Sequence, residues 1–299
     1  MNLFHAEINN WKEWGDVFQS IAAFEPLVKF ILEKEKLPIR ELEHLTPGTN
    51  AVFKAGDYVI KLFVPKESGF DGTVDRESEL FSVKRASADG INTPKLKAIG
   101  FVDDKYHFSY MITEYIKGVE FTNAVINMTD QIKIIFGQRL RAITDKINTP
   151  CPDFNGIDVI HSPVRQRRWK PYPESFRKER LNYINSYKYG SKVFTHGDLC
   201  GDNILLSEDN EIYIIDFADS VLAPVEYEHA LIAVELFDFD PALIKGYFGD
   251  CSKEYLADII FNGLLIHDFG GDIIQLHIGN VKEFNSLDKL RKAILMKLI

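Results

Sequence analysis

Cysteine is scarce in this chain, and the few cysteines lack the spacing of a structural site. They are Cys151, Cys200 and Cys251. An odd number of widely separated cysteines does not match a disulfide framework, and no C-x-x-C pair is present to begin a zinc site. We therefore expect reduced thiols and no cysteine-bound metal.

Long apolar runs and excess positive charge are also missing. No stretch of 18 residues is uninterruptedly apolar, and the opening MNLFHAEINNWKEW lacks the basic-then-apolar order of a signal peptide. We expect a cytoplasmic protein without a membrane partner. The 35 lysines and arginines face 44 aspartates and glutamates, a net charge of −9. This balance disfavours nucleic acid as a partner and favours a cationic ligand.

The spacing of apolar residues changes along the 299 residues. Three-and-four spacing predicts helix over 10–36, whereas NAVFKAGDYVIKLF and KLKAIGFVDDKYHFSYMITEYI each read as two strands, with a helix between them at TVDRESELFSVKRASADG. Beyond Gly118 the pattern is mainly helical. We predict an α+β fold of two lobes. Residues 1–115 form a small antiparallel sheet lobe with a helical extension over 1–40, and residues 116–299 form a larger helical lobe.

The stretch VFTHGDLCGDNILL, residues 193–206, places two aspartates and an asparagine between apolar runs. Asn203 opens a strand that turns at 207–210, and the return strand EIYIIDF delivers Asp216. Such a hairpin brings Asn203 and Asp216 to one end of two paired strands, where their oxygens suit Mg²⁺. Asp198 then precedes the metal site and is placed to accept a proton from a hydroxyl. This set of groups predicts phosphoryl transfer.

The order of these residues resembles a known family. His196-x-Asp198-x-x-x-x-Asn203, followed by Asp216-Phe217, is similar to the catalytic loop and metal-binding segment of eukaryotic-like kinases. With glycine after the histidine, it resembles the aminoglycoside phosphotransferase and choline kinase branch, and thus implies the bilobal protein kinase-like fold. The resemblance implies that Asp198 is the catalytic base and that Asn203 and Asp216 hold Mg²⁺.

A lysine in the small lobe supports this resemblance. Lys61 lies inside the apolar strand YVIKLF, where a charge is costly to bury without a partner. Kinases of this kind pair a strand lysine that contacts the phosphates with a glutamate on a helix. Glu77 and Glu79 both lie on the predicted helix, two positions apart and therefore on different faces. We predict Glu77 as the partner, from its spacing to Lys61.

Two further segments are nucleotide contacts by resemblance. The loop TPGTNAVF at 46–53 stands where the phosphates are covered, although it lacks G-x-G-x-x-G, and an ordinary hairpin turn is the alternative. The base of ATP or GTP would dock on the backbone where the first lobe ends. The residues concerned are Gly48, Thr49 and Asn50 in the loop, and Glu114, Tyr115 and Ile116 at the lobe boundary.

The resemblance implies a small-molecule acceptor with a hydroxyl group, and the net negative charge favours a cationic one. The leading hypothesis is an aminoglycoside antibiotic, which implies a role in antibiotic resistance. Choline, an amino alcohol or a sugar is the alternative, and a non-catalytic nucleotide- or partner-binding module is an alternative of another class. The basic stretch RQRRWKPYPESFRKER, residues 165–180, is either a surface for a phosphorylated partner or a solvated helix face. Either a monomer or a homodimer is compatible with the sequence.

Overall fold

Residues 2–298 are described by a computed structural model of the chain. The chain divides into two units of tertiary structure. Unit 1 contains residues up to 87 together with 92–118 and 207–218, and unit 2 contains 88–91, 119–206 and the residues from 219 onward. The sequence analysis placed a single boundary at 115/116. It did not anticipate that the short segment 207–218 joins unit 1.

Unit 1 is built on a five-stranded antiparallel sheet of strand order β1-β2-β3-β5-β4. Its strands are β1 (Leu42–His44), β2 (Ala51–Ala55), β3 (Tyr58–Leu62), β4 (Leu96–Asp103) and β5 (His107–Glu114). Both predicted hairpins are confirmed. In the first, Ala55 pairs with Tyr58, so Gly56 and Asp57 form a two-residue turn, and Gly56 adopts a φ of 62° that glycine tolerates without strain.

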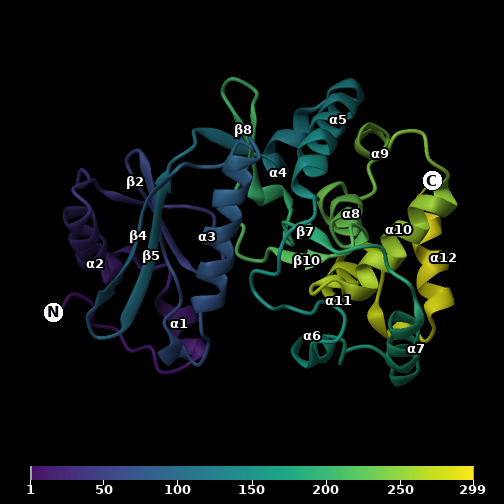
Figure 1. The fold of residues 1–299 in the computed structure, drawn as a ribbon, viewed down its shortest axis with the longest axis horizontal. Coiled ribbons are helices and arrows are strands. Elements are labelled where there is room, and N and C mark those ends of the chain that lie inside the picture. Colours follow the sequence, from purple (N-terminus) through teal and green to yellow (C-terminus); the bar gives the residue numbers. More distant parts are fainter. Residues whose placement is uncertain (1, 299) are drawn as a thin grey trace. The chain divides into compact units, whose positions relative to one another are not determined.

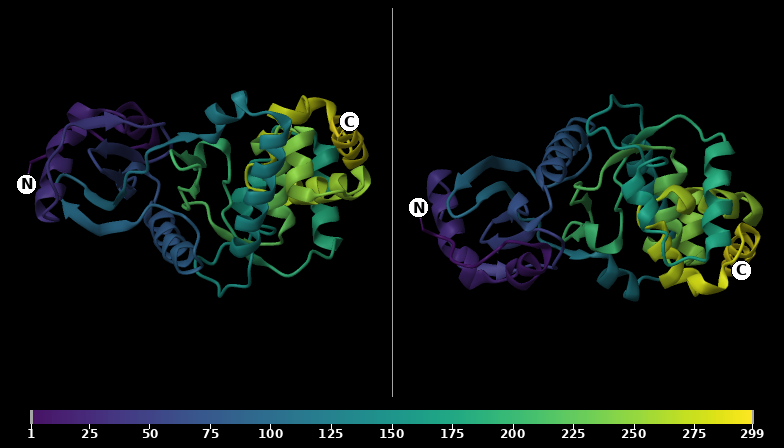
Figure 2. Two further views of the ribbon diagram at one scale, coloured as in Figure 1. Left: turned by 90° about the horizontal axis from the view of Figure 1, so that it is seen from above. Right: turned by 90° about the horizontal axis from the view of Figure 1, so that it is seen from below.

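Helices cover the two faces of this sheet, as Figures 1 and 2 show. Helices α1 (Trp11–Val17) and α2 (Ile21–Lys34) lie on one side, and α3 (Thr73–Ala88) lies on the other, with the short helix η1 (Lys66–Ser68) before it. Side chains alternate between the faces of a strand. Ile60 and Leu62 accordingly join the core formed with α2, and Lys61 points to the opposite face, toward α3. The N-terminal helices therefore form part of the core of unit 1.

Unit 2 is predominantly helical. Its longer helices are α5 (Asp130–Ile147), α7 (Glu174–Ser186), α9 (Pro241–Phe248), α10 (Lys253–Ile266) and α12 (Leu287–Lys297). Its shorter helices are α4 (Phe121–Ala124), η2 (Val125–Asn127), α6 (Pro163–Arg167), η3 (Gly201–Asn203), α8 (Glu226–Leu231), η4 (Ile232–Leu236), α11 (Gly270–Ile273), η5 (Ile274–Ile278) and η6 (Val281–Glu283). Helix α10 is largely buried, and it packs against α8 and α12 (Figure 1).

A two-stranded antiparallel sheet in unit 2 positions the loop that carries Asp198. Strand β7 (Val193–Thr195) pairs with β10 (Val221–Ala223), with Thr195 opposite Val221. The loop that leaves β7 therefore begins beside the residues that enter β10. The remaining strands are β6 (Gly118–Glu120), β8 (Ile204–Ser207) and β9 (Ile212–Ile214). Strands β8 and β9 flank the turn predicted at 207–210, where Asn210 N–H donates to the Ser207 carbonyl.

Candidate active site

Lys61 lies at the centre of a charged cluster in unit 1. Its Nζ is 2.9 Å from Glu79 Oε1, 2.8 Å from Glu79 Oε2 and 2.7 Å from Asp216 Oδ1. The side chain of Lys61 is only 10% exposed. Burial alone would lower the pKa of Lys61, but the carboxylates of Asp216 and Glu79 outweigh it and raise that pKa. Lys61 is therefore a permanently charged ammonium held by two carboxylates.

The prediction that Glu77 is the partner of Lys61 is wrong. Glu77 is 62% exposed and lies near Arg76, whereas Glu79 is buried against Lys61. The buried face of α3 also carries Val83 and Ala86, which follow Glu79 at intervals of four and seven residues. These intervals place all three on one helix face. Leu80 and Phe81 follow Glu77 at three and four residues, so neither the apolar pattern of the helix nor the spacing from Lys61 selects Glu79 from the sequence alone.

Asp75 is a carboxylate of this cluster that the sequence analysis missed. It lies one helical turn before Glu79, near Lys61 and Asp216. Burial raises the pKa of Asp75 to about 6, and the negative charge of Asp216 adds to this effect while Lys61 opposes it. Two carboxylates thus contact Lys61 and a third interacts with it electrostatically, so the cluster holds more acidic than basic groups and is suited to bind a cation.

Asp216 reaches Lys61 from the segment that follows β9. Its φ of 58° lies in the left-handed region, which is uncommon outside glycine but is tolerated by aspartate. Its side chain is 40% exposed, in contrast to Glu79. Asp216 therefore contacts Lys61 and also remains accessible to a ligand.

The loop after β7 arranges Asp198 and Asn203 in unit 2. The side-chain nitrogen Nδ2 of Asn203 donates to the backbone carbonyl oxygen of Asp198 at 2.8 Å and to the Asp198 carboxylate oxygen Oδ2 at 3.0 Å. His196 is fully buried, and its Nδ1 accepts a hydrogen bond from Asp198 N–H at 3.3 Å. Gly197, with a φ of 85°, packs so closely that an added Cβ would lie 2.1 Å from the Asp219 carbonyl oxygen. The position of Asp198 is thus fixed from both sides.

The positions predicted to contact nucleotide are placed in unit 1 as follows. Gly48 and Thr49 are exposed between β1 and β2, whereas Asn50 is buried and its Oδ1 accepts a hydrogen bond from Val64 N–H at 3.1 Å. Glu114 ends β5, and Tyr115 N–H donates to the Asp57 carbonyl at 2.8 Å. Ile116, two residues after the strand, is half-buried. Asn50 therefore anchors the loop, and Gly48 and Thr49 form its exposed part.

Comparison with known proteins identifies the family to which these groups belong. The model of the phosphotransferase enzyme family matches residues 49–255, more than two thirds of the chain. The chain belongs to this family. It is a phosphotransferase with an alcohol group as acceptor, and its match covers Lys61, Glu79, Asp198, Asn203 and Asp216. No curated protein sequence matches the chain.

Solved structures of similar fold support this conclusion. A mutant aminoglycoside 2'-phosphotransferase in its GDP complex is 16% identical, with a TM-score of 0.59 over 91% of this chain and 92% of that one. An ADP-bound aminoglycoside phosphotransferase is 14% identical, with a TM-score of 0.58 over 91% and 98%. The choline kinase LicA from Streptococcus pneumoniae is 17% identical, with a TM-score of 0.58 over 90% and 98%. The phosphotransferase therefore has the kinase-like α+β fold that the sequence predicted.

The basic stretch 165–180 of the phosphotransferase is in part the solvated helix face that the sequence suggested, because Lys178 pairs with Glu174 and both are exposed, but two of its arginines point inward. Arg165 donates to the hydroxyl of Tyr227 at 3.0 Å. Arg180 is 3% exposed, donates to the carbonyl oxygen of Leu265 at 2.8 Å and stacks over Trp169 at 3.9 Å. Burial lowers the pKa of Arg180 to about 9. These arginines hold the interior of unit 2 together, because their partners lie on helices and turns far along the chain.

Glu228, on α8, supports the loop that carries Asp198. It is fully buried, and its Oε2 accepts a hydrogen bond from Gly197 N–H at 3.3 Å. Burial raises the pKa of Glu228 to about 8, and the negative charge of Asp198 adds to this shift while the backbone N–H groups of His196 and Gly197 oppose it. Glu228 is thus favoured in its neutral form at this buried position.

We expect the ionisation of Glu228 to make the free energy of unfolding depend on pH. The unfolded chain loses the Glu228 proton near the ordinary pKa of 4.5, whereas the folded chain keeps it until about 8. Stability from Glu228 is therefore lost as pH rises from about 4.5 to 8. Glu228→Gln should raise the free energy of unfolding at pH 7 by about 1–2 kcal/mol and flatten this decline. Urea unfolding at several pH values, with exposed Glu254→Gln as control, measures it, and an unchanged slope would contradict it.

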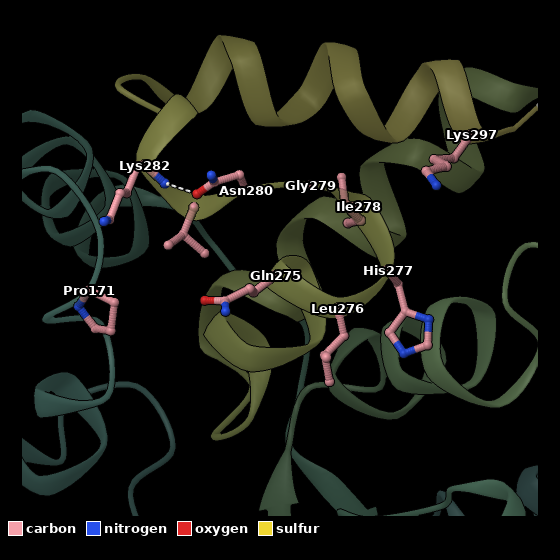
Figure 3. A pocket seen from close by; sticks show the side chains of 10 residues that line it. Pro171, Gln275, Leu276, His277, Ile278, Gly279, Asn280, Lys282 and Lys297 are labelled. Atoms are coloured by element: carbon pink, nitrogen blue, oxygen red, sulfur yellow. Dashed lines mark hydrogen bonds between the residues drawn. The ribbon is translucent and has the colours of Figure 1, made fainter.

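A cavity of about 640 Å³ opens beside the π-helical turn η5 (Figure 3). His277, Lys282 and Lys297 line it, and His277 Nδ1 lies 3.1 Å from Asp238 Oδ1. His277 also influences Glu235, whose pKa is raised by burial and by Asp198 and Asp202 while His277 lowers it. Within residues 2–298 no helix is long and apolar enough to cross a membrane.

The N-terminal helix α1 supports the exposed loop before β2. The indole nitrogen of Trp14 donates to the carbonyl oxygen of Thr49 at 2.9 Å, and the Trp14 side chain is 1% exposed. Trp14→Phe removes this hydrogen bond and part of the packed volume, so we expect a loss of about 1–2 kcal/mol in the free energy of unfolding. It should also raise the KM for nucleotide, because the loop is less ordered. Trp11→Phe, on the same helix but 50% exposed, is the control in both measurements. Equal effects of the two substitutions would contradict this role.

Proposed function

We propose that the phosphotransferase transfers the γ-phosphoryl group of ATP or GTP to a hydroxyl group of a small molecule. The observation that carries this proposal is the pair of preformed arrangements: Lys61 with Glu79 and Asp216, and Asp198 with Asn203. The Lys61 ammonium can bind phosphate oxygens when Asp216 binds a different cation and no longer pairs with it. Neighbours of the same fold are GDP and ADP complexes, which supports a nucleotide as donor.

The residues present suit a magnesium ion. Asp216 offers a partly exposed carboxylate, and Asn203, whose amide nitrogen is turned to Asp198, offers its Oδ1. Hard oxygen donors of this kind are the ligands that Mg²⁺ prefers, with the remaining positions taken by phosphate and water. When bound, the ion would neutralise the charge that develops on the phosphates.

The transfer step assigns one role to each side chain. Lys61 binds and orients the phosphates, and Glu79 holds the ammonium in place. Asp198 accepts a hydrogen bond from the acceptor hydroxyl and takes its proton as the new oxygen–phosphorus bond forms. The bond from the γ-phosphorus to the bridging oxygen breaks, and the nucleoside diphosphate leaves with the electron pair.

An aminoglycoside is the first candidate acceptor, and antibiotic resistance the corresponding biological role. Burial raises the pKa of Glu235, and the carboxylates of Asp198 and Asp202 add to this shift. An acceptor ammonium group placed there would relieve that repulsion. A choline or amino alcohol acceptor is the second candidate, because the choline kinase LicA has the same kind of fold.

Mass spectrometry of an acceptor panel tests the proposal. Purified phosphotransferase is incubated with Mg²⁺, ATP or GTP, and a mixture of aminoglycosides, choline, amino alcohols and sugars, with Asp198→Asn as control. We expect one acceptor class to gain a phosphoryl group with the natural enzyme only. If no acceptor is modified while nucleotide still binds, the chain is a non-catalytic binding module with respect to this panel, and the proposal fails for these acceptors.

A further inference from the structure

Helix α4 contacts the loop that carries Asp198 and Asn203, although the transfer step described above gives this helix no role. Thr122, its second residue, donates from its hydroxyl to the Asp202 carboxylate oxygen Oδ1 at 2.7 Å. Asp202 lies in the middle of η3 and directly precedes Asn203. A hydrogen bond to a carboxylate is stronger than one between neutral groups, and this length is normal for a hydroxyl donor. The bond therefore ties α4 to the residue next to the candidate metal ligand.

Gly201, the residue before Asp202, shows how closely the two segments approach. A Cβ added at Gly201 would collide with the Thr122 side chain and would lie 3.2 Å from the Thr122 backbone nitrogen. Glycine is the residue that allows such an approach of one backbone to another. The hydrogen bond between Thr122 and Asp202 therefore forms across a close packing contact, although both side chains are exposed at their outer edges.

Helix α4 is itself anchored in unit 2. Phe121 is 1% exposed, and its ring stacks on the ring of Phe136 in α5, with centroids 4.3 Å apart. A helix of four residues is not stable by itself and depends on such packing. Thr122 follows Phe121 directly, so it is a fixed point against which the loop is held.

Asn203 is bonded to its own loop in two places. Its backbone N–H donates to the Cys200 carbonyl at 3.2 Å, and its Nδ2 donates to the Asp198 backbone carbonyl at 2.8 Å. These bonds fix Asn203 within the loop, whereas the bond from Thr122 connects the loop to a helix about 80 residues earlier in the chain. The orientation of η3 relative to the rest of unit 2 thus depends on Thr122.

We propose that Thr122 is a positioning residue: its hydrogen bond to Asp202 holds η3 so that Asn203 presents its Oδ1 to the magnesium ion. The inference rests on the proposed function, which assigns that ion to Asn203 and Asp216. Thr122 acts through the loop. Because its side chain is exposed, a substitution removes no core packing, and the effect is expected in metal-dependent binding and not in stability.

Nucleotide binding with and without the metal tests this role in the absence of an acceptor. The Kd for ADP is measured by calorimetry on the full chain, once in Mg²⁺ and once in EDTA. Thr122→Val keeps the size of the side chain but has no donor, and Thr122→Ser keeps the hydroxyl. In Mg²⁺ we expect the Kd to rise about fivefold in Thr122→Val, the loss expected for one hydrogen bond, and to stay within about twofold in Thr122→Ser.

The measurement in EDTA separates positioning from general damage to the fold. Without the metal, Thr122→Val should bind ADP within about twofold of the natural protein, and its urea unfolding midpoint should be unchanged. An unchanged Kd in Mg²⁺ would overturn the proposal, and so would an equal rise in Mg²⁺ and in EDTA.

A double-mutant cycle tests whether the effect passes through Asp202. Asp202→Ala removes the acceptor of the hydrogen bond but also a negative charge, so this variant by itself does not isolate the bond. In the Asp202→Ala background, Thr122→Val should change the Kd for ADP in Mg²⁺ by less than about twofold, because its partner is already absent. A full fivefold effect in that background would overturn the proposal.

NMR of the side-chain amides tests the contact without any ligand. The full chain carries ¹⁵N-labelled asparagine, and the Asn203 signals are those missing in Asn203→Ser. We expect these signals to shift in Thr122→Val and to stay in place in Thr122→Ser; unshifted signals in Thr122→Val would overturn the proposal. If the natural protein binds ADP equally well in Mg²⁺ and in EDTA, the magnesium site of the proposed function is refuted instead, and the NMR result on Thr122 stands.

Discussion

Asp198→Asn is expected to lower kcat by about a thousand-fold while the Kd for nucleotide changes by less than about threefold. Asparagine has nearly the same shape, and its oxygen can still accept the hydrogen bond that Asn203 donates at 3.0 Å. The loop should therefore keep its conformation. An amide cannot take the proton of the acceptor hydroxyl, so only the transition state loses an interaction. Single-turnover phosphorylation of the acceptor found in the panel, together with nucleotide titration, measures both quantities.

The control for this prediction is Asp209→Asn. Asp209 is an exposed aspartate in the turn after β8, and its substitution should leave kcat within about twofold. If Asp198→Asn retains the natural kcat, Asp198 is not the base. If it loses nucleotide binding as well, its main role is to hold the loop, and the proton acceptor must be sought elsewhere.

The sequence predicted most of what alternation and local motifs determine. Lys61 stood out as a charge in an apolar strand, and the alternation of side chains along a strand explains why it lies on the face opposite Ile60 and Leu62. The turn at 207–210 was also correctly predicted. These features depend on neighbours within a few residues, which is the range over which apolar periodicity and turn residues carry information.

Other features depend on residues distant in the sequence, and the sequence could not reveal them. The choice between Glu77 and Glu79 is set by how α3 rotates against the sheet. Glu228 is a carboxylate whose neighbours in the sequence give no sign of burial, yet it is fully buried and accepts a hydrogen bond from a backbone N–H 31 residues away. Arg165 and Arg180 likewise find partners between 62 and 103 residues away. A charged residue is predicted to be exposed unless the sequence also identifies the partner that allows its burial.

Substitution of Glu79 gives the second large effect. Glu79→Gln removes one of the two carboxylates that hold the Lys61 ammonium, at 2.8 and 2.9 Å, but keeps the size of the side chain. Hydrogen bonds to charged groups contribute about 1.5–3 kcal/mol, so we expect kcat/KM for nucleotide to fall about 30-fold. Lys61 should move toward Asp216, because that carboxylate then becomes its remaining strong partner at 2.7 Å.

Glu77→Gln is the matched control, because it makes the same chemical change two residues earlier on the same helix. Glu77 is 62% exposed, and an exposed carboxylate contributes at most about 1 kcal/mol to any ion pair. We expect its kcat/KM for nucleotide to stay within about twofold of the natural value. The reverse pattern, with Glu77→Gln impaired and Glu79→Gln active, would show that the working enzyme pairs Lys61 with Glu77. Such a change would require α3 to rotate by about 200°, since each residue advances a helix by about 100°. The buried apolar residues Val83 and Ala86 would then face solvent, which makes that alternative costly in free energy.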